Sequence, residues 1–160
     1  MRLYLDQSGK WEESGPTAIG ISDEKSFRLS LYVDAQTKRT TERHFRERNS
    51  LKKKSKTAVQ VRCFAYLVFL ALRKTFREGD ELVLDREYEG HDQRIREILV
   101  HLFKNLERRN IAADQISFTQ VGKASLCHKV ALQAFCDNRT ANVRIRFEQL
   151  KALMEPVTKR

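Results

Sequence analysis

The chain has 160 residues, of which 41% are hydrophobic, and it carries a formal net charge of +10. This length and hydrophobic content fit one domain spanning residues 1–160 with a single core, and exclude a largely disordered chain. No apolar run approaches the roughly 18–20 residues of a membrane-spanning helix, and we expect no secretory signal, because a strand begins at the first residues.

The three cysteines give no sign of a disulfide framework or a zinc site. Cys63, Cys127 and Cys136 stand in or beside apolar helical surroundings and have no C-x-x-C spacing. Buried or nearly buried free thiols are typical of a reducing compartment. We therefore expect a cytoplasmic protein.

Three strands open the chain. Residues 2–6 and 17–22 are short apolar runs separated by a turn region that contains Gly9, Gly15 and Pro16. Residues 26–33 alternate apolar and polar side chains with a period of two, which predicts a half-buried antiparallel strand. The three segments together predict an antiparallel meander.

Helices and strands alternate in the rest of the chain. The apolar pattern predicts helices over residues 57–77, 91–109, 122–135 and 141–154, and strands over residues 81–85 and 115–121. The order is βββαβαβαα. We expect an α/β fold with a mixed five-stranded sheet and helices on both of its faces.

Two aspartates end two of the predicted strands. Asp6 follows the run Met1-Arg-Leu-Tyr-Leu5 and leads into Gln-Ser-Gly, and Asp85 ends Glu81-Leu-Val-Leu. Carboxylates fixed at the ends of neighbouring strands can share a divalent ion, because hard oxygen ligands suit Mg²⁺ or Mn²⁺. A positively charged chain with such a site is expected to act on a polyanion.

These features resemble the ribonuclease H-like nuclease superfamily. The resemblance depends on Leu5-Asp6-Gln-Ser-Gly9, on Leu84-Asp85 and on Ser125-Leu-Cys-His128 at the start of a late helix, and the opening also resembles an uncharacterised group beginning Asp-Glu-Ser-Gly. It implies that two metal ions, roughly 4 Å apart, drive phosphodiester hydrolysis. It further implies that Asp6 is shared by both metals, that Asp85 holds one, and that His128 is a ligand or a proton shuttle.

One part of the family pattern is absent. Members usually present a glutamate from the first long helix, and residues 57–72 contain none. Glu42 or Glu47 could fold in as a substitute, or the chain could be a relative without catalytic activity. Glu87 is a possible auxiliary ligand, although a solvent-facing loop charge is the favoured interpretation.

The segment of residues 37–62 is strongly basic, with ten Lys or Arg against two Glu. We interpret residues 37–56 as an insertion, part helix and part loop, that contacts phosphates, because clustered cations attract polyanions. Arg39, Arg43 and Arg46 would share one helical face. The candidate nucleic-acid contacts are Lys38, Arg39, Arg43, Arg46, Arg48, Lys52, Lys53, Lys54 and, beside the predicted metals, Lys123.

Two other functions stay open at this point. A non-catalytic nucleic-acid-binding module would keep the fold and the basic segment, and the missing helix glutamate favours it. A protein-interaction domain would use the same segment against an acidic partner. Hydrolysis of nucleoside triphosphates is excluded, because Gly122-Lys-Ala-Ser125 lacks the spacing of a phosphate-binding loop.

Overall fold

A mixed six-stranded sheet forms the centre of the computed structural model, which describes residues 1–48 and 55–155. Its spatial order is β5-β4-β1-β2-β3-β6. The strands are β1 (Arg2–Ser8), β2 (Thr17–Ser22), β3 (Arg28–Val33), β4 (Glu81–Asp85), β5 (Ile116–Thr119) and β6 (Val143–Arg144). β2 is antiparallel to both of its neighbours, and all other pairs are parallel. The expected meander and the pairing of the strands that end in Asp6 and Asp85 are both confirmed.

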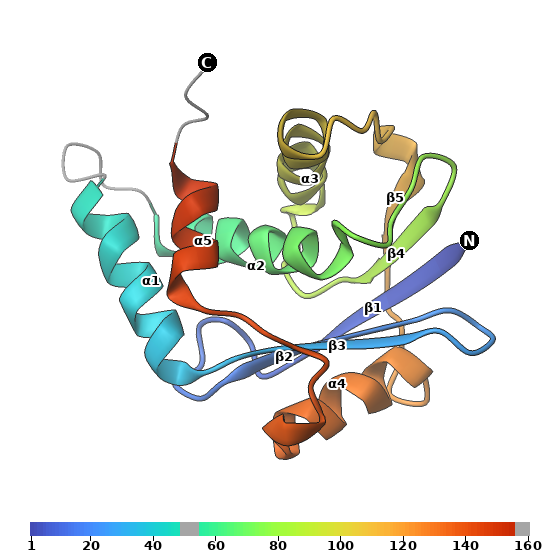
Figure 1. Ribbon diagram of the computed structural model, residues 1–160, viewed down its shortest axis with the longest axis horizontal. Coiled ribbons are helices and arrows are strands. Elements are labelled where there is room, and N and C mark those ends of the chain that lie inside the picture. The colour runs from blue at the N-terminus through green and yellow to red at the C-terminus, as the bar shows by residue number, and fades with distance from the viewer. Residues whose placement is uncertain (49–54, 156–160) are drawn as a thin grey trace.

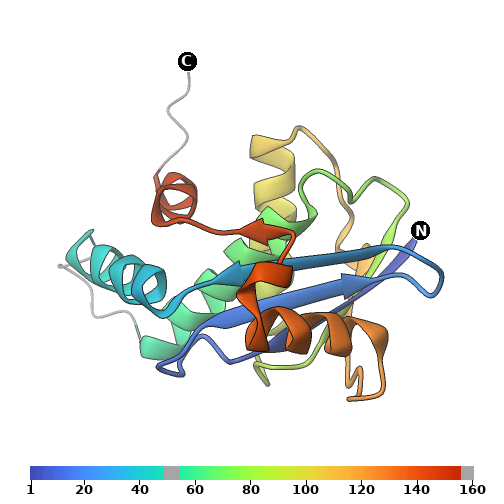
Figure 2. The same cartoon turned by 60° about the horizontal axis from the view of Figure 1, so that its bottom comes forward.

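Helices cover the two faces of the sheet (Figures 1 and 2). α4 lies alone on one side against β1, β2 and β3, while α2 lies on the other side with α3 against it. α1 packs against α5 at the end of the sheet where β3 leads into α1. The helices are α1 (Ala35–Arg48), α2 (Lys56–Leu72), α3 (Asp92–Leu106), α4 (Leu126–Cys136) and α5 (Phe147–Met154), and two short 3₁₀ turns are η1 (Ala113–Gln115) and η2 (Asn138–Thr140).

α2 is the buried helix of the fold. Its side chains from Val59 onward are buried almost without exception, because it lies between the sheet and the helices α3 and α5. Ser55 caps its first turn by accepting a hydrogen bond from the Ala58 amide at 3.1 Å. The helix ends at Leu72 rather than at residue 77, and Gly79 takes a positive φ of 85° in the turn that leads to β4.

The C-terminal region differs from the expected single helix over residues 141–154. Val143 and Arg144 form β6 beside β3, and the Ile145 amide donates to the Tyr32 carbonyl at 2.8 Å. The alternation Val-Arg-Ile-Arg in residues 143–146 has the period of a strand, and α5 begins only at Phe147. The sheet therefore has a sixth strand that the sequence patterns did not predict.

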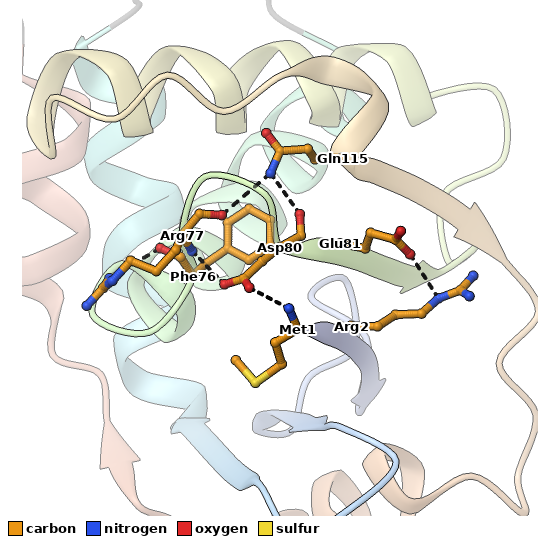
Figure 3. Close-up of polar contacts among 7 residues, drawn as sticks. All are labelled: Met1, Arg2, Phe76, Arg77, Asp80, Glu81 and Gln115. Atoms are coloured by element: carbon orange, nitrogen blue, oxygen red, sulfur yellow. Dashed lines mark hydrogen bonds and ion pairs between the residues drawn. The ribbon is translucent and has the colours of Figure 1, made fainter.

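A polar network fixes β1 against β4 at the ends where the two strands begin (Figure 3). The amine of Met1 lies 2.8 Å from Asp80 Oδ1, and the other carboxylate oxygen accepts from the Arg77 amide at 2.8 Å. The Gln115 side chain donates to the Asp80 carbonyl at 2.7 Å, which adds the start of β5 to the network. Because these contacts set the register, Asp6 and Asp85 come to equivalent positions on the two central strands. β4 ends at Asp85, whereas β1 continues to Ser8 rather than ending at Asp6 as predicted.

Two further predictions concern the membrane and the cysteines. Among residues 1–48 and 55–155, no helix combines the length and the apolar character needed to cross a bilayer. All three cysteines are free; Cys63 and Cys127 are buried, whereas Cys136 is exposed. Burial raises the pKa of the two buried thiols, so both stay protonated.

Candidate metal centre

Asp6 and Asp85 lie side by side on the two central strands, Asp6 two residues before the end of β1 and Asp85 at the end of β4. β1 and β4 are parallel neighbours, and Leu5 lies opposite Leu84, so the residue that follows each leucine lies at the same edge. Leu5 and Leu84 belong to the hydrophobic core. The alternation of a strand then turns both aspartates toward the face that carries α4. The predicted meeting of the two carboxylates is confirmed.

Glu87 completes an acidic cluster with these two aspartates. The Glu87 amide donates to the Asp85 carbonyl at 3.0 Å, and this tight turn brings the glutamate back toward the strand end. One carboxylate oxygen from each of Asp6, Asp85 and Glu87 lies within 4.8 Å of the other two. Asp6 is 5% exposed and the Glu87 side chain 13% exposed. The interpretation of Glu87 as a solvent-facing loop charge is therefore wrong.

Neither Glu42 nor Glu47 takes the place of the missing helix glutamate. Glu42 accepts a hydrogen bond from the Trp11 indole at 2.9 Å, and Glu47 is exposed near the end of α1. The third carboxylate comes from the loop after β4. The spacing Asp85-Arg-Glu87 at the end of this strand could have indicated Glu87 as a ligand, because a turn there brings the two carboxylates together.

The cluster concentrates negative charge in a poorly solvated place. Burial, a hydrogen bond with Asp85 and the neighbouring carboxylates raise the pKa of Glu87 to about 7, while Lys10, 3.8 Å away, opposes the shift. Burial also raises the pKa of Asp6, against hydrogen bonds from His128 and the Gln7 amide. Three carboxylates held so close together repel one another unless a cation lies between them. The cluster could thus hold a divalent metal ion.

His128 contacts the cluster through Asp6. It lies in the first turn of α4, where Ser125 caps the helix by accepting from the His128 amide at 3.3 Å. Its Nδ1 lies 2.5 Å from Asp6 Oδ2, so an Nδ1–H would donate to the carboxylate and fix its orientation. The triad of mutually close ligands consists of Asp6, Asp85 and Glu87. The position of His128 is that of a partner to a ligand, and its direct binding of metal stays a prediction.

Gly20 allows His128 to reach Asp6. It lies opposite Asp6 on β2, and a Cβ atom there would lie 2.1 Å from the Cys127 carbonyl oxygen and 2.4 Å from the Ala131 nitrogen. The backbone of α4 thus packs directly on the strand. The sequence patterns gave no signal for this residue, because nothing in a single glycine within a strand identifies the helix that packs on it.

Lys38 has a different role from the one predicted. Its ammonium group is buried and donates to the carbonyls of Lys10, Glu13 and Gly15 at 3.0, 2.9 and 2.8 Å. Burial lowers its pKa to about 8, although nearby glutamates oppose the shift. With all three protons engaged, Lys38 is not available for phosphate, and we remove it from the predicted nucleic-acid contacts.

The loop of residues 10–15 that Lys38 holds extends to the acidic cluster. Trp11 is buried in it, and Lys10 forms the ion pair with Glu87. Glu12 accepts from the Tyr88 hydroxyl at 3.4 Å. The loop thus connects α1 with the segment that carries Glu87, and so helps to position the third carboxylate.

The remaining predicted nucleic-acid contacts are divided between α1 and the loop before α4. As expected, the basic segment is helical over Ala35–Arg48, and Arg39, Arg43, Arg46 and Arg48 are exposed there. Arg46 also forms a 3.7 Å ion pair with Glu42. Lys123 is exposed in the turn that precedes α4. Lys52, Lys53 and Lys54 lie outside the described residues.

Comparison with known proteins gives no further assignment, because no protein-family model and no curated protein matches this chain.

Proposed function

We propose that this chain is a metal-dependent nuclease of ribonuclease H-like fold that hydrolyses phosphodiester bonds in nucleic acid. The observation that carries the proposal is the cluster of Asp6, Asp85 and Glu87, whose ligand oxygens lie within 4.8 Å of one another. The strand order, with β1 and β4 adjacent and parallel at the centre, supports the fold assignment.

The donor set favours Mg²⁺ or Mn²⁺. All three groups of the cluster are carboxylates, and oxygen ligands suit these hard ions better than softer metals. When bound, such an ion supplies an activated water and stabilises the leaving oxygen of the phosphodiester.

The residues of the chain have distinct tasks in this proposal. The three carboxylates hold the ion at the edge of the sheet, and His128 keeps Asp6 in position through the contact at Nδ1. The exposed arginines of α1 bind the phosphate backbone without reading the sequence, since phosphate contacts position rather than specify.

Hydrolysis of labelled oligonucleotides with Mn²⁺ or Mg²⁺ tests the proposal. Asp6→Asn and Asp85→Asn keep the size of each side chain but remove the charge that holds the ion. We expect each to reduce the rate by about 100-fold or more, as for other losses of electrostatic stabilisation in an active site. Asp114→Asn is the matched control, because Asp114 is exposed in η1 and should leave the rate unchanged.

Two results would contradict the proposal. Activity that persists in Asp6→Asn, or in the wild type with a chelator, would exclude the metal mechanism. Binding of nucleic acid without cleavage by the wild type would favour the non-catalytic binding module.

A further inference from the structure

The face of the sheet that carries Asp6 continues beyond the cover of α4. Tyr4 precedes Asp6 by two residues, so the two side chains lie on the same face. Opposite them on β2 are Ser22 and Gly20. α4 packs on Gly20 and begins at Leu126, and it leaves Tyr4 and Ser22 at the edge of an opening.

This opening is a cavity of about 400 Å³ between β1, the β2–β3 hairpin and the connection from β5 to α4. Its size lies toward the lower end of small-molecule pockets, which occupy roughly 300–1,000 Å³. The residues of its wall that matter here are Tyr4, Ser22, Glu24, Val121, Leu126 and Cys127.

The wall of the cavity that contains Val121 is hydrogen-bonded to the candidate metal centre. The Val121 amide donates to Asp85 Oδ1 at 2.7 Å, and Cys127 directly precedes His128 in α4. A molecule in the cavity therefore lies beside the proposed metal ligands. A nucleotide whose phosphate reaches Asp6 and Asp85 can place another of its parts in this cavity.

Two carboxylates line the cavity together with neutral polar side chains. Glu24 accepts from the Tyr4 hydroxyl at 2.7 Å through one oxygen of its carboxylate. The Asp23 carboxylate accepts from the Lys25 and Phe27 amides, both at 2.9 Å, and so fixes the turn that carries Glu24. Among the described residues, the lining includes these two carboxylates and no Lys or Arg. Carboxylate oxygens only accept hydrogen bonds, so they favour a ligand with N–H donors.

We propose that this cavity binds a nucleobase that carries an exocyclic amino group. The Tyr4 ring offers a surface for stacking, the wall of Val121 and Leu126 offers apolar contact, and the Glu24 carboxylate accepts from the amine. The inference rests on the proposed function, because it assigns the cavity to a nucleotide of the substrate. It makes the cavity the element that selects among bases next to the cleaved bond.

Two matched pairs of nucleosides test the proposal without any catalysis. Adenosine and inosine, like cytidine and uridine, differ in whether the base presents an amino group or a carbonyl at one position. Each is titrated to 10 mM into the metal-free protein with chelator, and binding is followed by NMR at the Val121 and Cys127 amides. We expect adenosine or cytidine to bind at least fivefold more tightly than its carbonyl counterpart.

Three variants separate stacking from recognition of the amine. Tyr4→Leu should weaken binding of the preferred nucleoside about tenfold, as expected for loss of a stacking ring, whereas Tyr4→Phe should preserve it. Glu24→Gln should reduce the preference for the amino base at least threefold. Glu97→Gln on α3, an exposed glutamate outside the cavity, is the matched control.

Several results would overturn the proposal: no shift with any nucleoside at 10 mM, equal affinity within both pairs, or binding that Tyr4→Leu leaves unchanged. These results are independent of the nuclease test, since no metal is present. Binding of the amino bases without any cleavage would support the proposed base-binding cavity and contradict the proposed nuclease function.

Discussion

Lys38 and the acidic cluster are two places where the described residues bury charge, and the two differ in their partners. Lys38 is buried on α1 with three carbonyl oxygens within hydrogen-bond distance of its ammonium group. Asp6, Asp85 and Glu87 face one another instead. Lys10 forms a 3.8 Å ion pair with Glu87, and the His128 ring contacts Asp6.

The difference separates a charge whose hydrogen bonds are satisfied within the fold from a cluster of charges that could hold a metal ion. The contacts of Lys38 satisfy all three of its protons, and they hold the loop of residues 10–15 in place. In the cluster, burial and the neighbouring carboxylates raise the pKa of Glu87 to about 7. The repulsion among the three carboxylates is relieved only when a cation or a proton lies between them. Removing a charge should therefore have opposite effects on stability at the two places.

The largest effect on stability is expected for Lys38→Met. The methionine fills much of the space but removes the donor to the Glu13 and Gly15 carbonyls, while the Lys10 carbonyl keeps its bond from the Glu13 amide at 3.1 Å. Each unsatisfied group costs about 1–3 kcal/mol. We expect a loss of about 3–5 kcal/mol in the free energy of unfolding, measured by urea denaturation. Arg39→Met, at an exposed neighbouring position, should change it by less than about 0.5 kcal/mol. A loss below about 1 kcal/mol for Lys38→Met would mean that its three hydrogen bonds contribute little.

Gly20→Ala should have the next largest effect, because it displaces the helix that carries His128. The added Cβ would lie 2.1 Å from the Cys127 carbonyl oxygen, so α4 must move away from β2. Overpacking of this kind costs about 1–3 kcal/mol. The shift should also break the contact between His128 and Asp6, which NMR of the imidazole nitrogens would detect.

Gly15→Ala is the matched control for this change. A Cβ at Gly15 would meet no atom within 4 Å, and its substitution should leave the His128 signals in place. His128 spectra that do not change in Gly20→Ala would show that α4 is not held by this close approach.

Glu87→Gln should stabilise the metal-free protein at pH 8 by about 1–2 kcal/mol, because it removes one of three repelling carboxylates. The pKa of Glu87 is raised from 4.5 to about 7 in the folded protein. Between these values the folded state binds more protons than the unfolded chain, so stability falls as the pH rises. The contribution is fully present below pH 4.5 and is lost as the pH rises through 7.

Denaturation curves at pH 5, 6, 7 and 8 measure this effect. The wild type should lose stability over this range relative to Glu87→Gln, and saturating Mn²⁺ should reverse the loss in the wild type only. Glu89→Gln, an exposed glutamate two residues further along, is the control. If the free energy of unfolding depends on pH in the same way for the wild type and Glu87→Gln, the surroundings of Glu87 do not raise its pKa.

Sequence patterns predicted the strands and helices that depend on short, continuous segments of the chain. The runs ending in Asp6 and Asp85 marked the central strands, and their common apolar character indicated that they pair. The short strand Val143–Arg144 was not predicted, because two residues carry too little periodicity to compete with the helical pattern around them.

The roles of charged side chains were harder to predict, since they depend on contacts between distant segments. Lys38 and Arg39 are adjacent in a basic sequence, yet one is buried against residues 10–15 and the other is exposed. Glu87 looked like a loop charge until the turn after β4 placed it beside Asp85. No local pattern distinguishes Lys38 from Arg39, and the spacing Asp85-Arg-Glu87 indicates the cluster only if a turn follows the strand.

The smallest effect on stability is expected for neutralising the exposed arginines of α1, which sharpens the contrast with Lys38 on the same helix. The triple change of Arg39, Arg43 and Arg46 to Gln should alter the free energy of unfolding by less than about 1 kcal/mol, because all three side chains are exposed. It should instead weaken binding of duplex DNA and reduce the slope of log K against log salt by up to about 0.9 for each phosphate that the helix no longer binds. Titration of a fluorescent duplex at several salt concentrations measures the affinity and its salt dependence.

A triple Gln variant of Lys25, Lys74 and Lys104 is the control, because it removes the same charge from exposed positions elsewhere. It should keep a steeper slope than the α1 variant. If the two triple variants give the same slope, the charge of α1 acts only through the net charge of the protein, and the nuclease proposal would then depend on the acidic cluster alone.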